Sequence, residues 1–161
     1  MNQELHTESE LSRAFVKFLS EQGFLPISAD NVSWNKFPII HQSIPPLPAE
    51  LESTRAQLKS ALNTHNGIYC YLNSRDELLY VGKGAPLWSR IYSHYLEAFR
   101  AVSGDRKGVW HSFFSSHYGG LTILWRSVQG ERQRRIIEEM IECVESSVFD
   151  KEFPRGKRTT S

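Results

Sequence analysis

Apolar residues recur along this chain with two different periods, and each change of period separates one predicted element from the next. Segment 9–22 carries apolar side chains at helical spacing, namely Leu11, Phe15, Phe18 and Leu19. Thr7 and Glu10 have the spacing of a capping box, and Gly23 is a typical helix end. The pattern therefore predicts an amphipathic helix in this first part of the chain.

Segment 24–48 has no clear period and contains the prolines Pro26, Pro38, Pro45, Pro46 and Pro48. The last three of them cannot continue a helix, so we expect an extended connector here. Segment 49–62 then returns to helical spacing, with leucines along one face at Leu51, Leu58 and Leu62. We therefore predict that residues 1–62 form a helical extension with a proline-rich connector.

Two short apolar runs follow, and turn-forming residues separate them. Residues 67–73 and 77–83 are rich in aromatic and aliphatic side chains, which is typical of strands. Between them, Asn73-Ser74-Arg75-Asp76 supplies side chains that favour a chain reversal. The pattern predicts an antiparallel hairpin, which would place Tyr69 and Tyr80 on neighbouring strands.

A helix is predicted after the hairpin, with Pro86 in its first turn, where helices tolerate proline. Its apolar residues recur at helical spacing and should face the core; they are Trp88, Ile91, Tyr92, Tyr95 and Phe99. At about 100° per residue, Arg90 and His94 fall close together on the opposite side. This helix should therefore present a cation and an imidazole away from its apolar stripe.

The last third of the chain predicts an aromatic helix over 108–118, a third strand over 121–128 and a helix over 131–149. The stripe of that last helix consists of Ile137, Ile141, Val144 and Val148. We therefore expect an α/β domain of the α+β kind over residues 63–150, with a small three-stranded antiparallel sheet flanked by helices. Residues 151–161 form a basic tail.

Composition is that of a packed globular protein. The chain has 161 residues, of which 40% are hydrophobic and 12% aromatic, enough for one domain with a core. No apolar run approaches the ~20 residues of a membrane span, and the acidic start lacks the features of a signal peptide. Cys70 and Cys143 are too few for a disulfide framework or a zinc cluster. We expect a cytoplasmic protein that does not bind membranes.

The formal net charge of +1 neither favours nor excludes nucleic acid, but basic residues gather in two places. One cluster comprises Arg126, Arg132, Arg134 and Arg135, and the other comprises Lys151, Arg155, Lys157 and Arg158. Such clusters are more often solvated faces than phosphate contacts. If they do contact DNA, we expect Arg132, Arg135, Lys157 and Arg158 to do so.

Two tripeptides give the most specific signal. Gly67-Ile68-Tyr69 is followed after ten residues by Tyr80-Val81-Gly82, and Arg90 comes eight residues after Gly82. This arrangement resembles the GIY-YIG nuclease family, in which both tripeptides, a helix arginine and a distant glutamate form one metal-dependent phosphodiesterase site. The resemblance covers roughly residues 66–150.

The resemblance implies a role for each matched residue. Tyr69 would activate the attacking water, and Tyr80 would line the site and bind the phosphate or water. Arg90 would clamp phosphate oxygens with its guanidinium fork. His94 matches a histidine found in part of the family and could assist proton transfer. From the residues themselves, Lys83 could favour the Tyr69 phenolate and contact DNA.

The resemblance also implies one carboxylate on the last helix that holds a divalent cation, Mg²⁺ or Mn²⁺. Counting back twelve residues from Asp150 gives Glu138, although the family usually has asparagine at the position of Asp150. On the predicted helix, Glu138 and Glu145 border the apolar stripe and Glu142 points further toward solvent. Glu138 is therefore the predicted metal ligand.

Together these features predict a metal-dependent DNA endonuclease, most nearly of the restriction type. A structure-specific repair or recombination nuclease is the first alternative, and a nucleic-acid-binding module with an idle site is the second. The helical extension would serve DNA contact or dimerisation. A homodimer is one way to cut both strands, since a single site cuts one strand at a time.

Overall fold

The computed structural model describes residues 2–99 and 109–154, and only the backbone of residues 2–8. Its centre is one antiparallel sheet with strand order β1-β4-β2-β3. The strands are β1 (Asn35–His41), β2 (Gly67–Leu72), β3 (Leu78–Gly84) and β4 (Gly119–Ser127). The predicted α+β class is therefore confirmed, and the predicted hairpin forms as β2 paired with β3.

The prediction of three strands was wrong, because β1 adds a fourth from the segment taken as a connector. It pairs antiparallel with β4, with Phe37 opposite Ile123 and Ile39 opposite Leu121. Only Ile39 and His41 of this strand are buried, so its sequence lacks a long apolar pattern. Pro38 is tolerated because β1 is an edge strand, whose outer N–H groups need no partner strand.

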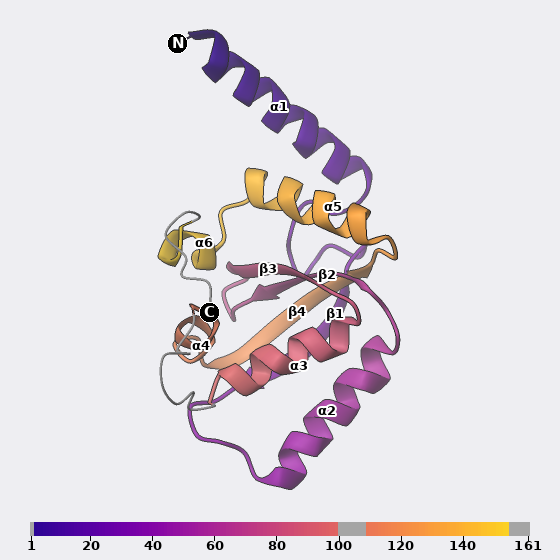
Figure 1. Ribbon diagram of the computed structural model, residues 1–161, viewed down its shortest axis with the longest axis vertical. Coiled ribbons are helices and arrows are strands. Elements are labelled where there is room, and N and C mark those ends of the chain that lie inside the picture. The colour runs from indigo at the N-terminus through magenta and orange to yellow at the C-terminus, as the bar shows by residue number, and fades with distance from the viewer. Residues whose placement is uncertain (1, 100–108, 155–161) are drawn as a thin grey trace.

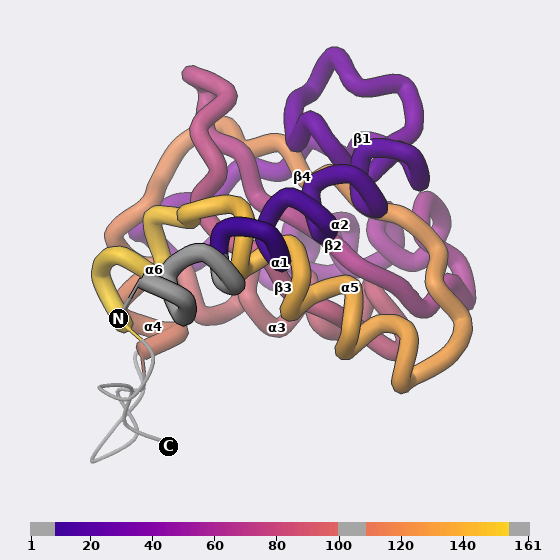
Figure 2. The backbone as a smooth tube through the Cα atoms, turned by 90° about the horizontal axis from the view of Figure 1, so that it is seen from above, coloured from indigo at the N-terminus to yellow at the C-terminus, as the bar shows by residue number. Residues whose placement is uncertain are grey.

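Helices cover both faces of the sheet (Figure 1). The helices are α1 (Asn2–Glu21), α2 (Pro48–Leu62), α3 (Leu87–Glu97), α4 (Val109–Phe114), α5 (Glu131–Val144) and α6 (Val148–Glu152). α5 lies over one face with the C-terminal part of α1 packed against it, and α2 and α3 lie over the other; the rest of α1 projects away from the sheet (Figure 1 and Figure 2). Within the described residues, no helix combines the length and the apolar character needed to cross a bilayer.

Strand β2 is buried along its whole length, and its side chains alternate between two cores. Ile68, Cys70 and Leu72 pack in the core under α1 and α5. Tyr69 and Tyr71 point to the opposite face and pack in the core formed with α2, α3, α4 and α6. The side of the sheet that carries the tyrosines is therefore the side on which the predicted chemistry must be sought.

Three predicted boundaries differ from the structure. The first helix begins at Asn2, so the predicted capping box lies inside it rather than at its start. The predicted aromatic helix is only the short α4. The helix predicted over 131–149 is two helices in the structure, because α5 ends at Val144 and α6 begins at Val148. Ser147 precedes α6, and its hydroxyl accepts a hydrogen bond of 3.1 Å from the backbone N–H of Asp150. Serine favours such N-caps over helix interiors, which explains the break.

Candidate active site

The two tripeptides lie side by side in the β2–β3 hairpin. Tyr71 stands directly opposite Tyr80, and Tyr69 stands opposite Gly82. The ring centroids of Tyr69 and Tyr80 are 5.9 Å apart. A Cβ atom at Gly82 would lie 2.5 Å from the phenol oxygen of Tyr69, so only glycine leaves room for this ring. The glycine of the second tripeptide thus makes space for the tyrosine of the first.

The most specific contact in this cluster joins Tyr69 to His94. The Tyr69 hydroxyl and His94 Nε2 form a buried hydrogen bond of 2.6 Å. The imidazole stacks on Phe114, with ring centroids 4.4 Å apart. Burial lowers the pKa of His94 well below its usual value, and the charge of Arg90 lowers it further. His94 is therefore neutral near pH 7, and with its proton on Nδ1 it accepts the phenol's hydrogen bond.

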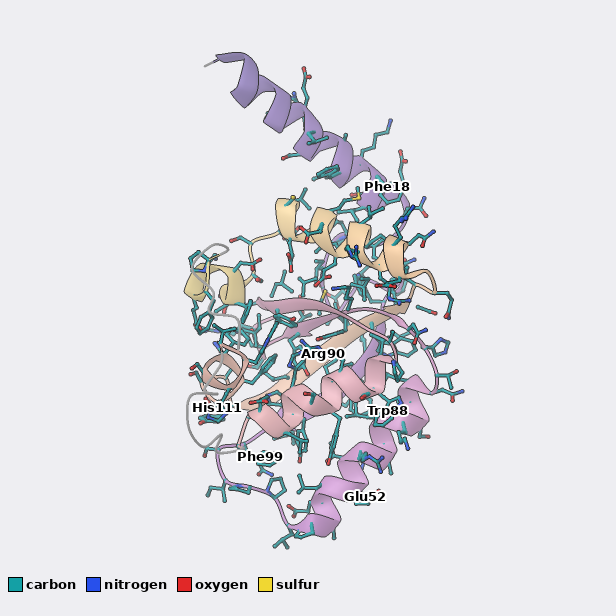
Figure 3. All side chains as sticks on the ribbon, viewed as in Figure 1. Phe18, Glu52, Trp88, Arg90, Phe99 and His111 are labelled. Atoms are coloured by element: carbon teal, nitrogen blue, oxygen red, sulfur yellow. The ribbon has the colours of Figure 1, made fainter. Side chains whose placement is uncertain are left out.

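The prediction that His94 lies opposite the core-facing stripe of its helix was wrong. His94 is 1% exposed and points toward the sheet together with Leu87 and Ile91. Figure 3 shows Arg90 on the sheet side of α3 and Trp88 on the side toward α2. The helix packs on both the sheet and α2, so it has two apolar faces, and the aromatic stripe visible in the sequence marks only part of them.

Tyr69 itself is fully buried. Burial raises the pKa of its phenol, while the charge of Arg90 and a hydrogen bond with Tyr80 act against that rise. Lys83, which we expected to favour the phenolate, pairs with Glu138, and the charge of Arg90 acts on Tyr69. The helix arginine therefore both acts on the buried phenol and reaches the neighbouring pocket.

A pocket of about 750 Å³ opens beside this cluster, between β3 and α5. Tyr80 and Trp110 contribute aromatic side chains to its wall. Gly84 and Ala85 also line it, and its charged side chains are the cations Lys83, Arg90 and Arg134 and the carboxylates Glu131, Glu138, Glu139 and Glu142. Tyr80 thus reaches the pocket, whereas Tyr69 lies behind the residues that line it.

Lys83 and Glu138 meet in this pocket. Lys83 Nζ lies 3.1 Å from Glu138 Oε2, and the two side chains are 41% and 15% exposed. Glu142 also lines the pocket, one helical turn after Glu138, so the expectation that it points toward solvent was wrong. Glu145 is not among the pocket residues and lies near Cys70 on the other core. Compared with the orientation predicted from its apolar stripe, helix α5 is therefore rotated so that Glu138 and Glu142 both face the pocket.

The carboxylates of this pocket could hold a divalent cation with only one or two protein ligands. Among the residues described, no three His, Cys, Asp or Glu side chains are grouped as a metal-binding set. Mg²⁺ needs no such group, because it is commonly held by one or two carboxylates, waters and substrate phosphate. The carboxylate of Glu138 already holds the cationic ammonium of Lys83. Glu138, with Glu142 nearby, is the position that suits a hard cation.

The basic cluster of the sequence is divided among different environments. Arg134 is 6% exposed and donates from Nη1 to the carbonyls of Val128 and Gln129, at 3.0 and 2.6 Å. Arg135 pairs with Glu131 at 3.2 Å, and Arg132 is exposed. Of the predicted DNA contacts, Lys83 and Arg90 line the pocket. The proposed contacts at Lys157 and Arg158 lie outside the described residues.

Sequence reasoning missed three residues of this region. Tyr71 contacts both Tyr69 and Tyr80, with ring centroids 5.9 and 6.4 Å away, and its place two residues after Tyr69 on a strand is a signal that could have identified it. His41 reaches the same core from β1, 5.7 Å from the rings of Tyr71 and Phe114. Trp110 lines the pocket from the short helix α4. No sequence signal marked the last two, because they come from segments outside the motif.

No protein-family model matches this sequence, and no curated protein matches it either.

Proposed function

We propose that this protein is a metal-dependent DNA endonuclease that hydrolyses phosphodiester bonds, most nearly as a restriction-type enzyme. The observation that carries the proposal is the 2.6 Å hydrogen bond between Tyr69 and neutral His94, directly behind a pocket lined by Tyr80 and Arg90. Hydrolysis of a phosphodiester requires a proton acceptor for water, positive charge at the phosphoryl oxygens and stabilisation of the leaving oxygen. The pocket and the cluster behind it together contain groups suited to each task.

In this proposal the phosphate lies between Arg90 and Lys83. The guanidinium of Arg90 supplies two N–H donors in a fixed fork, and the ammonium of Lys83 supplies a mobile charge. Both side chains line the same pocket as Glu138. Glu138 would hold Mg²⁺ or Mn²⁺, which when bound polarises the phosphoryl group and stabilises the leaving oxygen.

Proton transfer would begin at the pocket and end in the core. Tyr80 reaches the pocket and is hydrogen-bonded to Tyr69, which in turn is bonded to His94. A proton from the attacking water can thus pass through Tyr80 to Tyr69, while the proton of Tyr69 moves to His94 Nε2. This route requires no free phenolate beforehand, which suits a phenol whose pKa burial has raised.

One observation favours a second candidate, an idle nucleic-acid-binding module. The ion pair at 3.1 Å between Lys83 and Glu138 already neutralises the carboxylate that would hold the metal. In that case the pocket would bind phosphate through Arg90 and Lys83 without cutting the strand. The two candidates differ in one measurable property, which is metal-dependent strand cleavage.

The test is incubation of the purified protein with supercoiled plasmid in Mg²⁺, in Mn²⁺ and in excess chelator. We expect nicked or linear DNA with either metal and none with chelator. The Glu138→Gln chain, purified identically, controls for a contaminating nuclease and should be inactive. DNA binding without cleavage under all conditions would instead favour the idle module, and sequencing of the product ends would show whether cutting is sequence-specific.

A further inference from the structure

Trp110 lines the pocket and contacts both the proposed phosphate clamp, Arg90, and the tyrosine cluster. Its indole ring lies 5.2 Å from Arg90 Cζ, a distance at which the cation is attracted to the aromatic face. The same ring lies 5.2 Å from the ring of Tyr80, at 89°, and 5.3 Å from that of His94. Trp110 therefore contacts three of the residues to which the proposed function assigns a role.

The plane of this indole is itself fixed. Phe149, the buried aromatic residue of α6, stacks on Trp110 at 5.0 Å with an angle of only 7° between the rings. Tyr80 also packs against Phe149, with ring centroids 5.1 Å apart. An aromatic ring held in this way presents a face of defined orientation to Arg90.

Arg90 needs such support. Its side chain is long and solvent-exposed, and ordering a free arginine is costly in rotamer entropy. None of the ion pairs formed between described residues includes Arg90. The hydroxyls of Tyr69 and Tyr80 act on the guanidinium through hydrogen bonds, and the indole of Trp110 is an aromatic face within cation–π distance of it.

We propose that Trp110 is a positioning residue that holds the guanidinium of Arg90 in the orientation in which it clamps phosphate. The effect of Trp110 on DNA cleavage rests on the proposed function, whereas the contact between Trp110 and Arg90 does not. Trp110 acts through Arg90, so its value to cleavage should depend on the arginine being present. A merely structural tryptophan would not show that dependence.

The first test compares cleavage by Trp110→Leu and Trp110→Phe under single-turnover conditions with saturating DNA. Loss of a cation–π contact should slow Trp110→Leu about 5- to 30-fold, and phenylalanine, which keeps an aromatic face, should restore most of the rate. In a chain that already carries Arg90→Met, Trp110→Leu should cause no further loss. Equal losses with and without the arginine would overturn the proposal.

Trp88 provides a matched control. It makes the same kind of contact with Arg55 and Lys59, at 5.5 and 4.7 Å, but does not line the pocket. Trp88→Leu should therefore cut at a rate within about 2-fold of the parent. A loss as large as that of Trp110→Leu would show that cleavage responds to core damage generally, and would overturn the assignment.

A second readout is independent of cleavage. In the parent chain the indole ring current should shift the Nε–H resonance of Arg90 upfield in nuclear magnetic resonance spectra, and Trp110→Leu should abolish that shift. If the parent protein cuts no DNA, the proposed function fails, but this resonance still tests whether Trp110 positions Arg90. An Arg90 signal at the position of a free arginine in the parent chain would refute it.

Discussion

Lys83 and Glu138 form an ion pair that joins β3 to α5, with 3.1 Å between Nζ and Oε2. The ammonium thus occupies one oxygen of the carboxylate proposed to hold a divalent cation. A bound metal and Lys83 would compete for this oxygen. The pair is also partly exposed, so its strength is limited by solvent screening.

Replacing Lys83 with methionine, which keeps the length of the side chain, should tighten Mn²⁺ binding about 2- to 5-fold, as expected from removal of a partly exposed ion pair. Cleavage should nevertheless fall, because a phosphate-binding charge is lost. Calorimetric titration of Mn²⁺ without DNA measures the first effect. Unchanged or weaker binding in Lys83→Met would show that the lysine does not compete with the metal.

Tyr69→Phe removes the hydroxyl that faces His94 and should lower cleavage by roughly 10²- to 10⁴-fold, the usual contribution of a general base. DNA affinity should barely change, since Tyr69 does not line the pocket. Tyr80→Phe should be similarly impaired if the proton passes through Tyr80. Single-turnover rates measure both effects.

Tyr71→Phe is the matched control on the same strand. Its hydroxyl is buried and, within the described part of the chain, has no hydrogen-bond partner. Removing an unsatisfied buried hydroxyl should leave the melting temperature unchanged or raise it, and cleavage should be normal. If Tyr71→Phe loses as much activity as Tyr69→Phe, the cleavage rate depends on the packing of the tyrosine cluster and not on the Tyr69 hydroxyl in particular.

Glu138→Gln should abolish metal-dependent cleavage and leave DNA binding intact, because glutamine keeps the shape and loses the charge that attracts the cation. Glu142→Gln should have an intermediate effect, since Glu142 lines the same pocket. Glu145→Gln, outside the pocket, should cut normally. A dead Glu142→Gln enzyme beside an active Glu138→Gln enzyme would move the metal ligand one helical turn along α5.

Two buried histidines should make stability depend on pH. Burial lowers the pKa of His41 to about 4 and that of His94 well below its usual 6.5. Repulsion between imidazolium charges on His41 and His117 lowers the pKa of His41 further, and repulsion from Arg90 and His41 lowers that of His94 further. The unfolded chain binds these protons more readily than the folded chain, so stability is complete above pH ~6.5 and is lost as the pH falls toward 4, with a slope of up to ~1.4 kcal/mol per pH unit for each histidine.

Urea unfolding between pH 4 and pH 8 measures this slope. His41→Phe should make it shallower by about one proton, because it removes one of the two groups and keeps an aromatic ring beside Tyr71 and Phe114. If the slope in His41→Phe equals that of the parent, His41 is not titrating in this range.

The sequence was informative where local signals determine structure. Turn residues between two apolar runs predicted the β2–β3 hairpin, which forms, and Arg90, to which the family resemblance pointed, lines the pocket beside it. The sequence was misleading where tertiary packing decides which way a side chain faces. His94 is buried because α3 packs on two neighbours, and Glu142 faces the pocket because of the rotation of α5. Neither fact has a local signature.

Two of the three missed residues share one property. His41 and Trp110 come from β1 and α4, which lie outside the β2–β3 hairpin that carries the tripeptides. An edge strand with a proline and a helix of six residues carry too few periodic positions to be recognised. Their positions in the site become visible only once the sheet order is known.

That sheet order also bears on how the chain can fold. β1 and β4 pair with Asn35 opposite Trp125, a contact across ninety positions of sequence, whereas the β2–β3 hairpin closes over a short turn. Long loops close at a greater entropic cost, so the hairpin should form early and β1 should dock late. During synthesis, β1 leaves the ribosome well before the strand that it must pair with. Until then it is an unpaired edge, and Lys36 and Pro38 are residues of the kind that keep such an edge from pairing with other chains.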